Sequence, residues 1–196
     1  MLHAFLNVDG RFPAHGVVLD NDGNLYGATR NGGDHDSGAV FKLAPDGQVT
    51  TLHSFNGWDG VDPYGRLDID KDGNLYGATG TGGSGAEGTV FKIAADGTFH
   101  ALQLLQRQAW RRAARRCAVY GRQRLWHRQP GRRRSCGCGV VYEITASGKE
   151  KVLHTFTGSD GGGYSAGLVR NRGTFYSTTT AFGAHSKGVV FSVTRK

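Results

Sequence analysis

Short hydrophobic stretches, each broken by polar residues, follow one another along most of the chain. Val49–Phe55, Asn74–Thr79 and Thr89–Ile93 are examples, and they are rich in β-branched and aromatic side chains. Turn sequences such as Asp72-Gly73 and Asp96-Gly97 separate consecutive stretches, and Asp-Gly pairs between such runs are typical of β-hairpins. The pattern therefore predicts an all-β fold of many short antiparallel strands.

Three sequence motifs recur with a shared period of about fifty residues. The segment Gly23–Thr29 returns unchanged as Gly73–Thr79 and in altered form as Gly173–Thr179. A Gly-x-Val-aromatic motif begins at residues 38, 88, 139 and 188, and a Leu-His-x-Phe motif begins at residues 2, 52 and 153. Four strands in about fifty residues are typical of a β-propeller blade, whereas a β-solenoid, the alternative, usually has shorter rungs.

The motifs divide the chain into about four repeats within a single repeat domain, residues 1–196. The expected repeats span approximately 6–55, 56–105, 106–156 and 157–196, and residues 1–5 form an additional N-terminal strand. That strand has the sequence of the last strand of a repeat, so it could complete the fourth blade and close a ring. Four blades are the lower limit for known propellers, and a fragment of a larger ring fits the pattern equally well.

The basic charge of the chain comes from one segment. The formal net charge is +8, but eleven arginines and no acidic residue lie between Gln106 and Cys138. Without those eleven, 13 of the 24 Lys and Arg residues remain against 16 Asp and Glu, so the rest is mildly acidic. The expected third Tyr-Gly motif is missing from this segment, and we expect residues 103–138 to be irregular and to disrupt the third repeat.

The genetic code suggests why the third motif is missing. Arg122–Arg128 can be encoded so that the frame one base later reads Gly-Asn-Ala-Tyr-Gly-Thr-Ala, which matches the absent motif. Leu105–Arg111 can similarly yield Phe-Asn-Gly-Lys-His-Gly-Gly, which is close to Phe55–Gly60. We therefore interpret 103–138 as a third repeat read out of frame. The alternative is a real insertion that binds nucleic acid through its arginines, which the hidden motifs disfavour.

Taken in order, Leu52–Phe55, Asp72–Thr79 and Gly88–Ile93 resemble the GloVer (Gloeo/Verruco) tandem repeat. The resemblance covers the chain outside the arginine-rich segment and implies a bacterial protein that is exported or held at the cell surface. It implies no established enzyme activity, no catalytic residues and no cofactor. Residues 1–5 already have repeat sequence and lack the charged and apolar regions of a signal peptide. No apolar run reaches the roughly 18 residues of a membrane span.

Alternate loops of an antiparallel meander emerge on the same face of the sheet. The Asp-Gly turns are tight, so the longer loops are expected to gather on the opposite face, where a ligand would bind. The candidate ligand-binding residues there are His15, Asp34, His35, Asp36, Trp58, Asp62, Tyr64, Glu87, Tyr164 and His185. Exposed aromatic and acidic side chains suit a glycan or a protein ligand. The alternative is that these loops are merely solvated, with Asp and Gly present for turn geometry.

Residues that recur in every repeat are expected to serve the fold rather than a reaction. On this basis we interpret three groups as structural: the histidines of the Leu-His-x-Phe motif, the Tyr-Gly tyrosines and the aspartates at 68, 70 and 72. The aspartates also match the start of a calcium loop, which is the alternative interpretation. Asp34-His35-Asp36 is either a cation or acid/base site or a solvated loop tip. No metal, cofactor or catalytic residue is predicted.

The sequence thus predicts a non-catalytic binding or scaffolding module. The second hypothesis is a hydrolase or lyase that acts on a polysaccharide at the long-loop face. The third is nucleic-acid binding through the arginine-rich segment.

Overall fold

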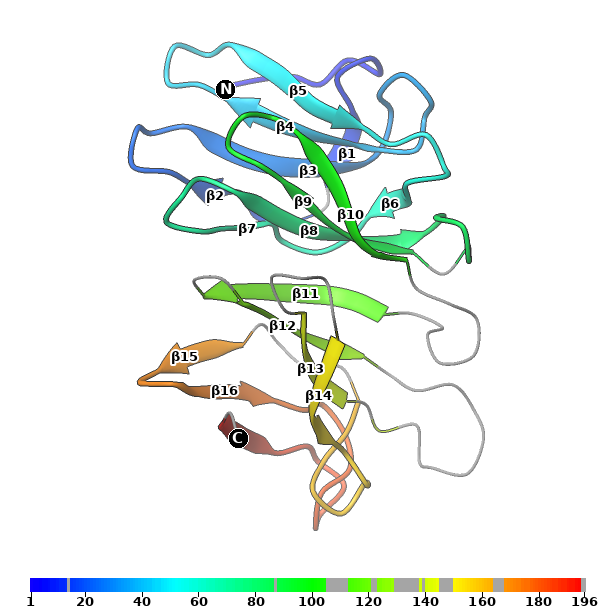
Figure 1. The fold of residues 1–196 in the computed structure, drawn as a ribbon, viewed down its shortest axis with the longest axis vertical. Helices are drawn as coiled ribbons and strands as arrows, with labels where there is room; N and C mark the ends of the chain where they lie inside the picture. Colours follow the sequence, from blue (N-terminus) through cyan, green and yellow to red (C-terminus); the bar gives the residue numbers. More distant parts are fainter. Residues whose placement is uncertain are drawn as a thin grey trace. The chain divides into compact units, whose positions relative to one another are not determined.

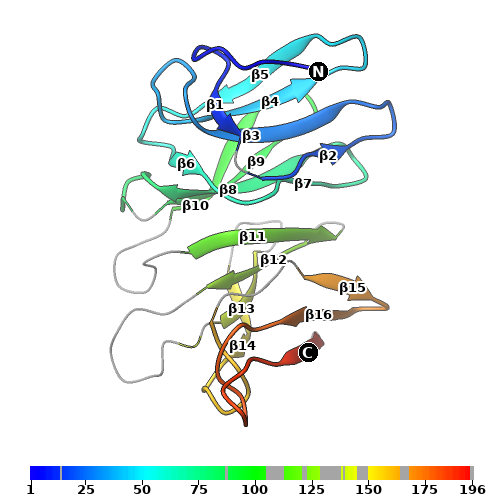
Figure 2. The same cartoon turned by 180° about the vertical axis from the view of Figure 1, so that it is seen from behind.

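A computed structural model describes residues 1–13, 15–86, 88–104, 113–120, 123–128, 138, 140–144, 150–163 and 168–194. Across these described ranges the regular structure consists of β-strands and no helix, so no helix there is long and apolar enough to cross a membrane. The chain divides into two compact units, Met1–Gln106 and Arg107–Lys196 (Figures 1 and 2).

The first sheet corresponds to the first repeat. It contains β1 (Arg11–Pro13), β2 (Val18–Leu19), β3 (Leu25–Asn31), β4 (Ala39–Leu43) and β5 (Val49–Ser54). The strand order is β1-β3-β4-β5, and β2 also pairs with β3, so two short strands share one side of β3. All of these pairs are antiparallel, as the hairpin turns predict.

The second sheet repeats the first with the same arrangement. It contains β6 (Val61–Pro63), β7 (Asp68–Ile69), β8 (Leu75–Thr81), β9 (Thr89–Ile93) and β10 (Phe99–Leu104). The strand order is β6-β8-β9-β10, with β7 also paired to β8. Each of these two sheets is therefore one blade, built from the motifs that recur in the sequence.

The glycine of the Tyr-Gly motif is required by an aromatic ring on the neighbouring strand. Gly27 pairs with Phe41, and Gly77 pairs with Phe91. A Cβ atom added at Gly27 would lie 2.5 Å from the Phe41 ring, and one at Gly77 would lie 2.4 Å from the Phe91 ring. Both distances are far below a normal carbon contact, so any side chain at this position would displace the ring.

Hydrophobic residues of both blades form the core of the first unit. Phe55 follows β5 of the first blade and is fully buried 5.2 Å, edge to face, from the Phe91 ring of the second blade. The phenylalanine of the Leu-His-x-Phe motif thus anchors one blade to the next. The other buried members of this core are Val18, Val40, Leu67, Leu75 and Ile93.

The second unit holds a four-stranded and a three-stranded sheet. The first of them contains β11 (Ala113–Tyr120), β12 (Gln123–Arg128), β13 (Val140–Ile144) and β14 (Glu150–Thr155), in that order. The second contains β15 (Val169–Asn171), β16 (Thr174–Thr178) and β17 (Val190–Thr194), again in chain order. The four antiparallel sheets agree with the expected array of four repeats.

The arginine-rich segment differs from its sequence-based expectation. We expected residues 103–138 to be irregular, whereas the structure places β11 and β12 inside this range. Val119, Tyr120, Leu125 and Trp126 are strand-forming residue types, and β13 offers β12 a complementary edge. The stretches 105–112, 121–122 and 129–137 lie outside the described residues.

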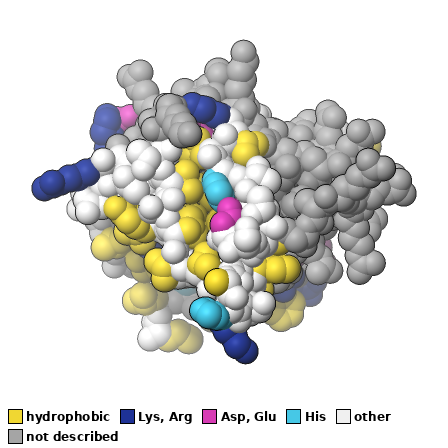
Figure 3. Space-filling model, turned by 90° about the horizontal axis from the view of Figure 1, so that it is seen from below, with side chains coloured by type: hydrophobic (Ala, Val, Ile, Leu, Met, Phe, Trp, Pro, Cys, Tyr) yellow, Lys and Arg dark blue, Asp and Glu magenta, His cyan; other side chains and the backbone are white. Residues whose placement is uncertain are grey.

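The second unit has its own core and an exposed apolar face. Its buried cluster comprises Cys138, Val141, Phe156, Leu168, Phe175 and Val193. Figure 3 shows hydrophobic side chains gathered in a band on the face seen from below Figure 1.

Residues 1–5 are in no strand, whereas the sequence predicted an N-terminal strand there. Phe5 nevertheless lies 5.0 Å from the Phe41 ring, much as Phe55 lies 5.2 Å from Phe91.

Candidate functional site

A forked ion pair joins the first blade to the second. The Arg30 side chain near the end of β3 donates from Nε to Asp62 Oδ1 at 2.6 Å and from Nη2 to Asp62 Oδ2 at 2.8 Å. These hydrogen bonds raise the pKa of Arg30 above its already high ordinary value. The arginine side chain is 45% exposed and the aspartate 27%, so a ligand can reach both groups from solvent.

Two aromatic rings lie beside this ion pair. The Arg30 guanidinium carbon lies 5.6 Å from the centre of the Tyr64 ring, within the range of a cation–π contact. The His15 ring approaches Tyr64 edge to face with 4.7 Å between centroids. His15, Arg30, Asp62 and Tyr64 are called the seam cluster below, because they meet at the seam between the two blades.

The seam cluster breaks the symmetry of the repeats. The residue after the Tyr-Gly-Ala-Thr stretch is Arg30 in the first repeat but Gly80 in the second. The position of Asp62, in the middle of β6, is taken by Phe12 in β1. A forked arginine–aspartate pair therefore occurs at this seam because of two residues that the repeat itself does not specify.

A second ion pair lies next to the seam cluster. Arg11 Nη2 donates to both carboxylate oxygens of Asp36, at 3.0 and 2.9 Å, and Asp36 also accepts the Gly32 N–H. The Asp62 N–H donates to the Ser37 carbonyl at 3.0 Å. The loop that carries Asp36 is therefore hydrogen-bonded directly to the strand that carries Asp62.

The structure brings together four of the ten predicted site residues, namely His15, Asp36, Asp62 and Tyr64. Arg11 and Arg30, which pair with two of these four, were not among the predicted residues. The prediction rested on aromatic and acidic side chains of the long loops, whereas Arg11 and Arg30 are basic residues of β1 and β3. Comparing the repeats position by position would have found Arg30, because the residue differs from its counterpart in the next repeat.

None of the remaining predicted residues belongs to the seam cluster or to the Arg11–Asp36 pair. Asp34 and His35 are exposed at their loop tip, and Trp58 is 81% exposed on a neighbouring loop of the first unit. His185 is exposed in the second unit. Glu87 and Tyr164 lie outside the described residues.

The recurring histidines each pair with an aspartate six residues later. The Nε2–Oδ2 distance is 2.8 Å for His3–Asp9 and 2.9 Å for both His53–Asp59 and His154–Asp160. The same aspartates accept a backbone N–H from the loop that leads to the next blade. The arrangement fixes the connection between blades, which agrees with the structural interpretation of these histidines.

Burial and pairing act in opposite directions on His53. Burial lowers the pKa of His53, and the nearby Asp59 carboxylate only partly offsets this effect. The ring is stacked on Phe99 with 3.8 Å between centroids and 8° between planes. The neutral imidazole is therefore the form that this site favours.

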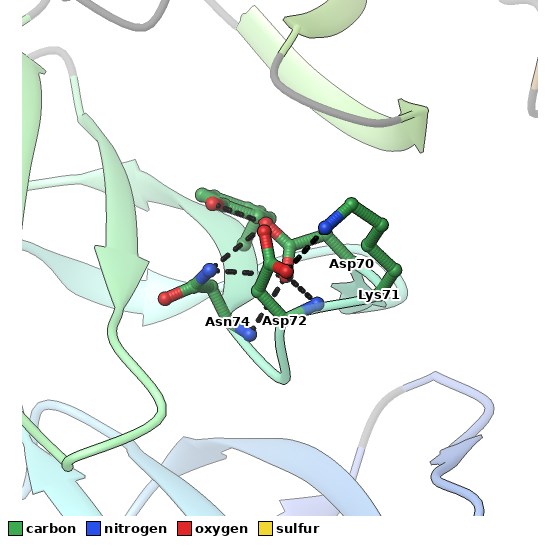
Figure 4. A network of polar contacts seen from close by, with 5 residues as sticks. Asp70, Lys71, Asp72 and Asn74 are labelled. Carbon is green, nitrogen blue, oxygen red and sulfur yellow. Dashed lines mark hydrogen bonds and ion pairs between the residues drawn. The ribbon is translucent and has the colours of Figure 1, made fainter.

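The repeated aspartates of the hairpin turns are hydrogen-bond hubs (Figure 4). The Asp70 carboxylate accepts the backbone N–H groups of Asp72 and Asn74, the Asn74 side-chain amide and the Tyr76 hydroxyl. Burial would raise the pKa of Asp70, but these hydrogen bonds outweigh it and lower the pKa overall. A carboxylate already engaged by four donors serves as a turn hub, as the turn interpretation expects, rather than as a calcium ligand.

The first blade has the same hub at Asp20, which accepts the Tyr26 hydroxyl at 2.9 Å. Burial and this hydrogen bond raise the pKa of Tyr26 to about 12. Within the part of the chain that the structure describes, no group of three or more His, Cys, Asp or Glu side chains is placed to hold a metal ion.

Comparison with solved structures places the chain in the β-propeller class. It resembles a gluconolactonase from Xanthomonas campestris, with 14% sequence identity and a TM-score of 0.57 over 91% of this chain and 61% of that one. It also resembles a luciferin-regenerating enzyme, with 16% identity and a TM-score of 0.53 over 91% of this chain and 60% of that one. The chain spans about three fifths of the length of each. At these identities the likeness shows the fold alone.

The sequence identifies the family within this class. The chain belongs to the Gloeobacter/Verrucomicrobia repeat family, whose model matches residues 1–113. This range covers both blades of the first unit and therefore the whole seam cluster. A search of curated proteins gives no match to the sequence.

Proposed function

We propose that this chain is a non-catalytic binding module and that the seam cluster binds a polar ligand. The observation that carries the proposal is the Arg30–Asp62 fork beside Tyr64, at positions where the neighbouring repeat has different residues. In a repeat protein, a feature that departs from the repeat and is not needed for packing is the best candidate for function.

The chemistry of the cluster favours a glycan over a protein as the ligand. Sugar hydroxyl groups accept hydrogen bonds from a guanidinium and donate them to a carboxylate, and the seam cluster offers both groups side by side. The aromatic ring of Tyr64 is suited to packing against a pyranose ring. A protein ligand remains the second candidate, because exposed aromatic and arginine side chains also serve protein interfaces.

The enzyme hypothesis receives no comparable support. The two similar structures are enzymes by their printed names, but their identity to this chain is 14 and 16%. We therefore keep binding as the proposed activity.

The test is calorimetric titration with a panel of neutral and acidic oligosaccharides. Arg30→Thr is the informative variant, because the fourth repeat carries Thr180 at this position and so keeps the blade sequence. We expect it to weaken glycan binding at least tenfold, and Tyr64→Ala to do the same. Lys71→Ala removes an exposed ion pair at a distant turn and is the control. No binding by the panel, or unchanged affinity in Arg30→Thr, would overturn the proposal.

We also propose that the protein acts outside the cytoplasm of a bacterium. The support is membership of the repeat family, whose members the sequence resemblance associates with export and surface attachment. Fractionation of the source cells with an antibody against the first unit tests this. Detection only in the cytoplasmic fraction would contradict it.

A further inference from the structure

Strand β12 carries a tryptophan where the first two blades need a glycine. Trp126 pairs with Tyr142 in β13, just as Gly27 pairs with Phe41 and Gly77 with Phe91. The registers agree along the whole strand, since Arg124 faces Ile144 as Leu25 faces Leu43. Trp126 thus occupies the position that holds Gly27 and Gly77 in the first two blades and the small residue Ser177 in the fourth.

In the first two blades this position leaves no room for a side chain. There, a single added Cβ atom would lie 2.4 to 2.5 Å from the ring of the paired phenylalanine. Tyr142, the residue opposite Trp126, is fully buried and is the aromatic member of the Gly-x-Val-aromatic motif in this repeat. The third blade therefore combines a buried aromatic residue with tryptophan at a position where the first two blades have glycine and the fourth has Ser177.

The genetic code resolves this conflict without any choice of codon. Tryptophan has one codon, TGG, and a reading frame that begins one base later starts with GG. All four GGN codons encode glycine, so the shifted frame must place glycine at position 126. Trp110 must become glycine too, and it lies one repeat period of fifty residues after Gly60. A Cβ at Gly60 would lie 2.4 Å from Thr79, so that glycine is also required by packing.

Neighbouring codons are less constrained, but their shifted readings allow the residues of the repeat. His127 is followed by an arginine, so its shifted codon encodes threonine or isoleucine, and Thr178 stands at the same place in the fourth repeat. Leu125 is followed by tryptophan, so its shifted codon encodes Phe, Ser, Tyr or Cys. Tyrosine is the residue of the other repeats at this position, Tyr26, Tyr76 and Tyr176.

The arginines also disappear whichever codons encode them. Every arginine codon has G as its second base, so the shifted codon begins with G and encodes Val, Ala, Asp, Glu or Gly. None of the eleven arginines between residues 106 and 138 survives this change. The eleven arginines of the segment are therefore a property of the reading frame.

We infer that the native third blade is the product of the shifted frame, with glycine at positions 110 and 126 and without the eleven arginines. The native protein is then a mildly acidic propeller-type chain whose third blade packs a glycine under Tyr142. It has no arginine-rich surface for nucleic acid. This inference does not depend on the proposed function, because the seam cluster lies entirely in the first unit.

Two measurements on native material test the inference. The first is to resequence the genomic DNA across codons 100–140, and the second is to map peptides of the protein purified from the source cells. We expect a one-base change of frame at each edge of the segment and a native peptide with glycine at position 126. A native peptide that contains Leu125-Trp126-His127-Arg128 would overturn the inference, as would codons that read as written and whose shifted frame does not spell the repeat.

Discussion

The second and third blades share a strand register but carry different residue types at corresponding positions. In the second blade Gly77 pairs with Phe91, and the Tyr76 hydroxyl donates to Asp70. In the third blade the same positions carry Trp126 and Leu125. Strand pairing thus restricts the residue types of a blade less than core packing does. Many residue types can form a strand, but few fit beneath a buried ring.

The largest expected effect comes from placing the third blade's residue in the second blade. Gly77→Trp puts a large side chain where even a Cβ would lie 2.4 Å from the Phe91 ring. We expect it to lower the free energy of unfolding by about 3 kcal/mol or more, measured by urea denaturation, because overpacking a filled core is destabilising.

Gly16→Ala is the matched control for this change. A Cβ at Gly16 meets no atom within 4 Å, and this backbone does not need the left-handed region. Its stability should stay within about 0.5 kcal/mol of the wild type. A Gly77→Trp chain as stable as this control would remove the packing difference between the two blades.

The next effect concerns the turn hub, which the third blade lacks because Tyr120 stands at the register position of Asp70. Asp70→Ala deprives Asn74, Tyr76 and the turn backbone of their acceptor, and we expect a loss of about 2 kcal/mol in unfolding free energy. Asp46→Ala is the control, since that carboxylate accepts the Gln48 N–H in an exposed turn. Equal losses in the two variants would mean that the hub adds nothing beyond a simple turn.

Titration of a tyrosine sharpens the same comparison in the first blade. Asp20→Asn removes the charge that Tyr26 faces, so the pKa of Tyr26 should fall from about 12 toward the ordinary tyrosine value of 10.0. The ultraviolet absorbance of tyrosinate, with Tyr26→Phe subtracted, reports this pKa. A pKa that stays near 12 would assign the shift to burial alone.

The smallest effect is a pH dependence at the connection between blades. Since His53 has a lowered pKa in the folded protein and one near 6.5 when unfolded, the unfolded chain binds more protons below that pH. Stability contributed by the neutral ring should therefore be present above pH 6.5 and decline as the pH falls below it. Denaturation at pH 8 and pH 5.5 should show a smaller difference in His53→Gln, which mimics Gln103 at the equivalent place in β10. Identical pH profiles for the variant and the wild type would contradict this.

Much of the fold follows from sequence periodicity, whereas little of the candidate site does. The repeats, the hairpin turns and the structural histidines recur, so each copy supports the interpretation of the others. The seam cluster depends on Arg30 and Asp62, which do not recur and lie 32 residues apart in sequence. Only the packing of two blades brings them together, so the sequence could indicate the face but not the ion pair.

In the arginine-rich segment, by contrast, the sequence did not predict the strands that the structure shows. Its composition predicted an irregular structure, but the register of β12 against β13 continues the repeat. Hydrogen bonds between strands join backbone groups. A segment can therefore pair as a strand of the sheet even where its residue types differ from those of the other repeats.

The most direct test of the claim that the third blade requires glycine at position 126 is the stability of Trp126→Gly, made in the chain of the printed sequence and measured by urea denaturation. Glycine within a strand ordinarily costs about 0.5 to 1 kcal/mol, so a position with no special requirement should lose stability. We expect a gain instead, because glycine leaves room for the buried ring of Tyr142, as Gly27 and Gly77 do for Phe41 and Phe91. Leu125→Gly, at the adjacent position, should lose stability and serves as the control. A loss in Trp126→Gly as large as that in Leu125→Gly would contradict the account.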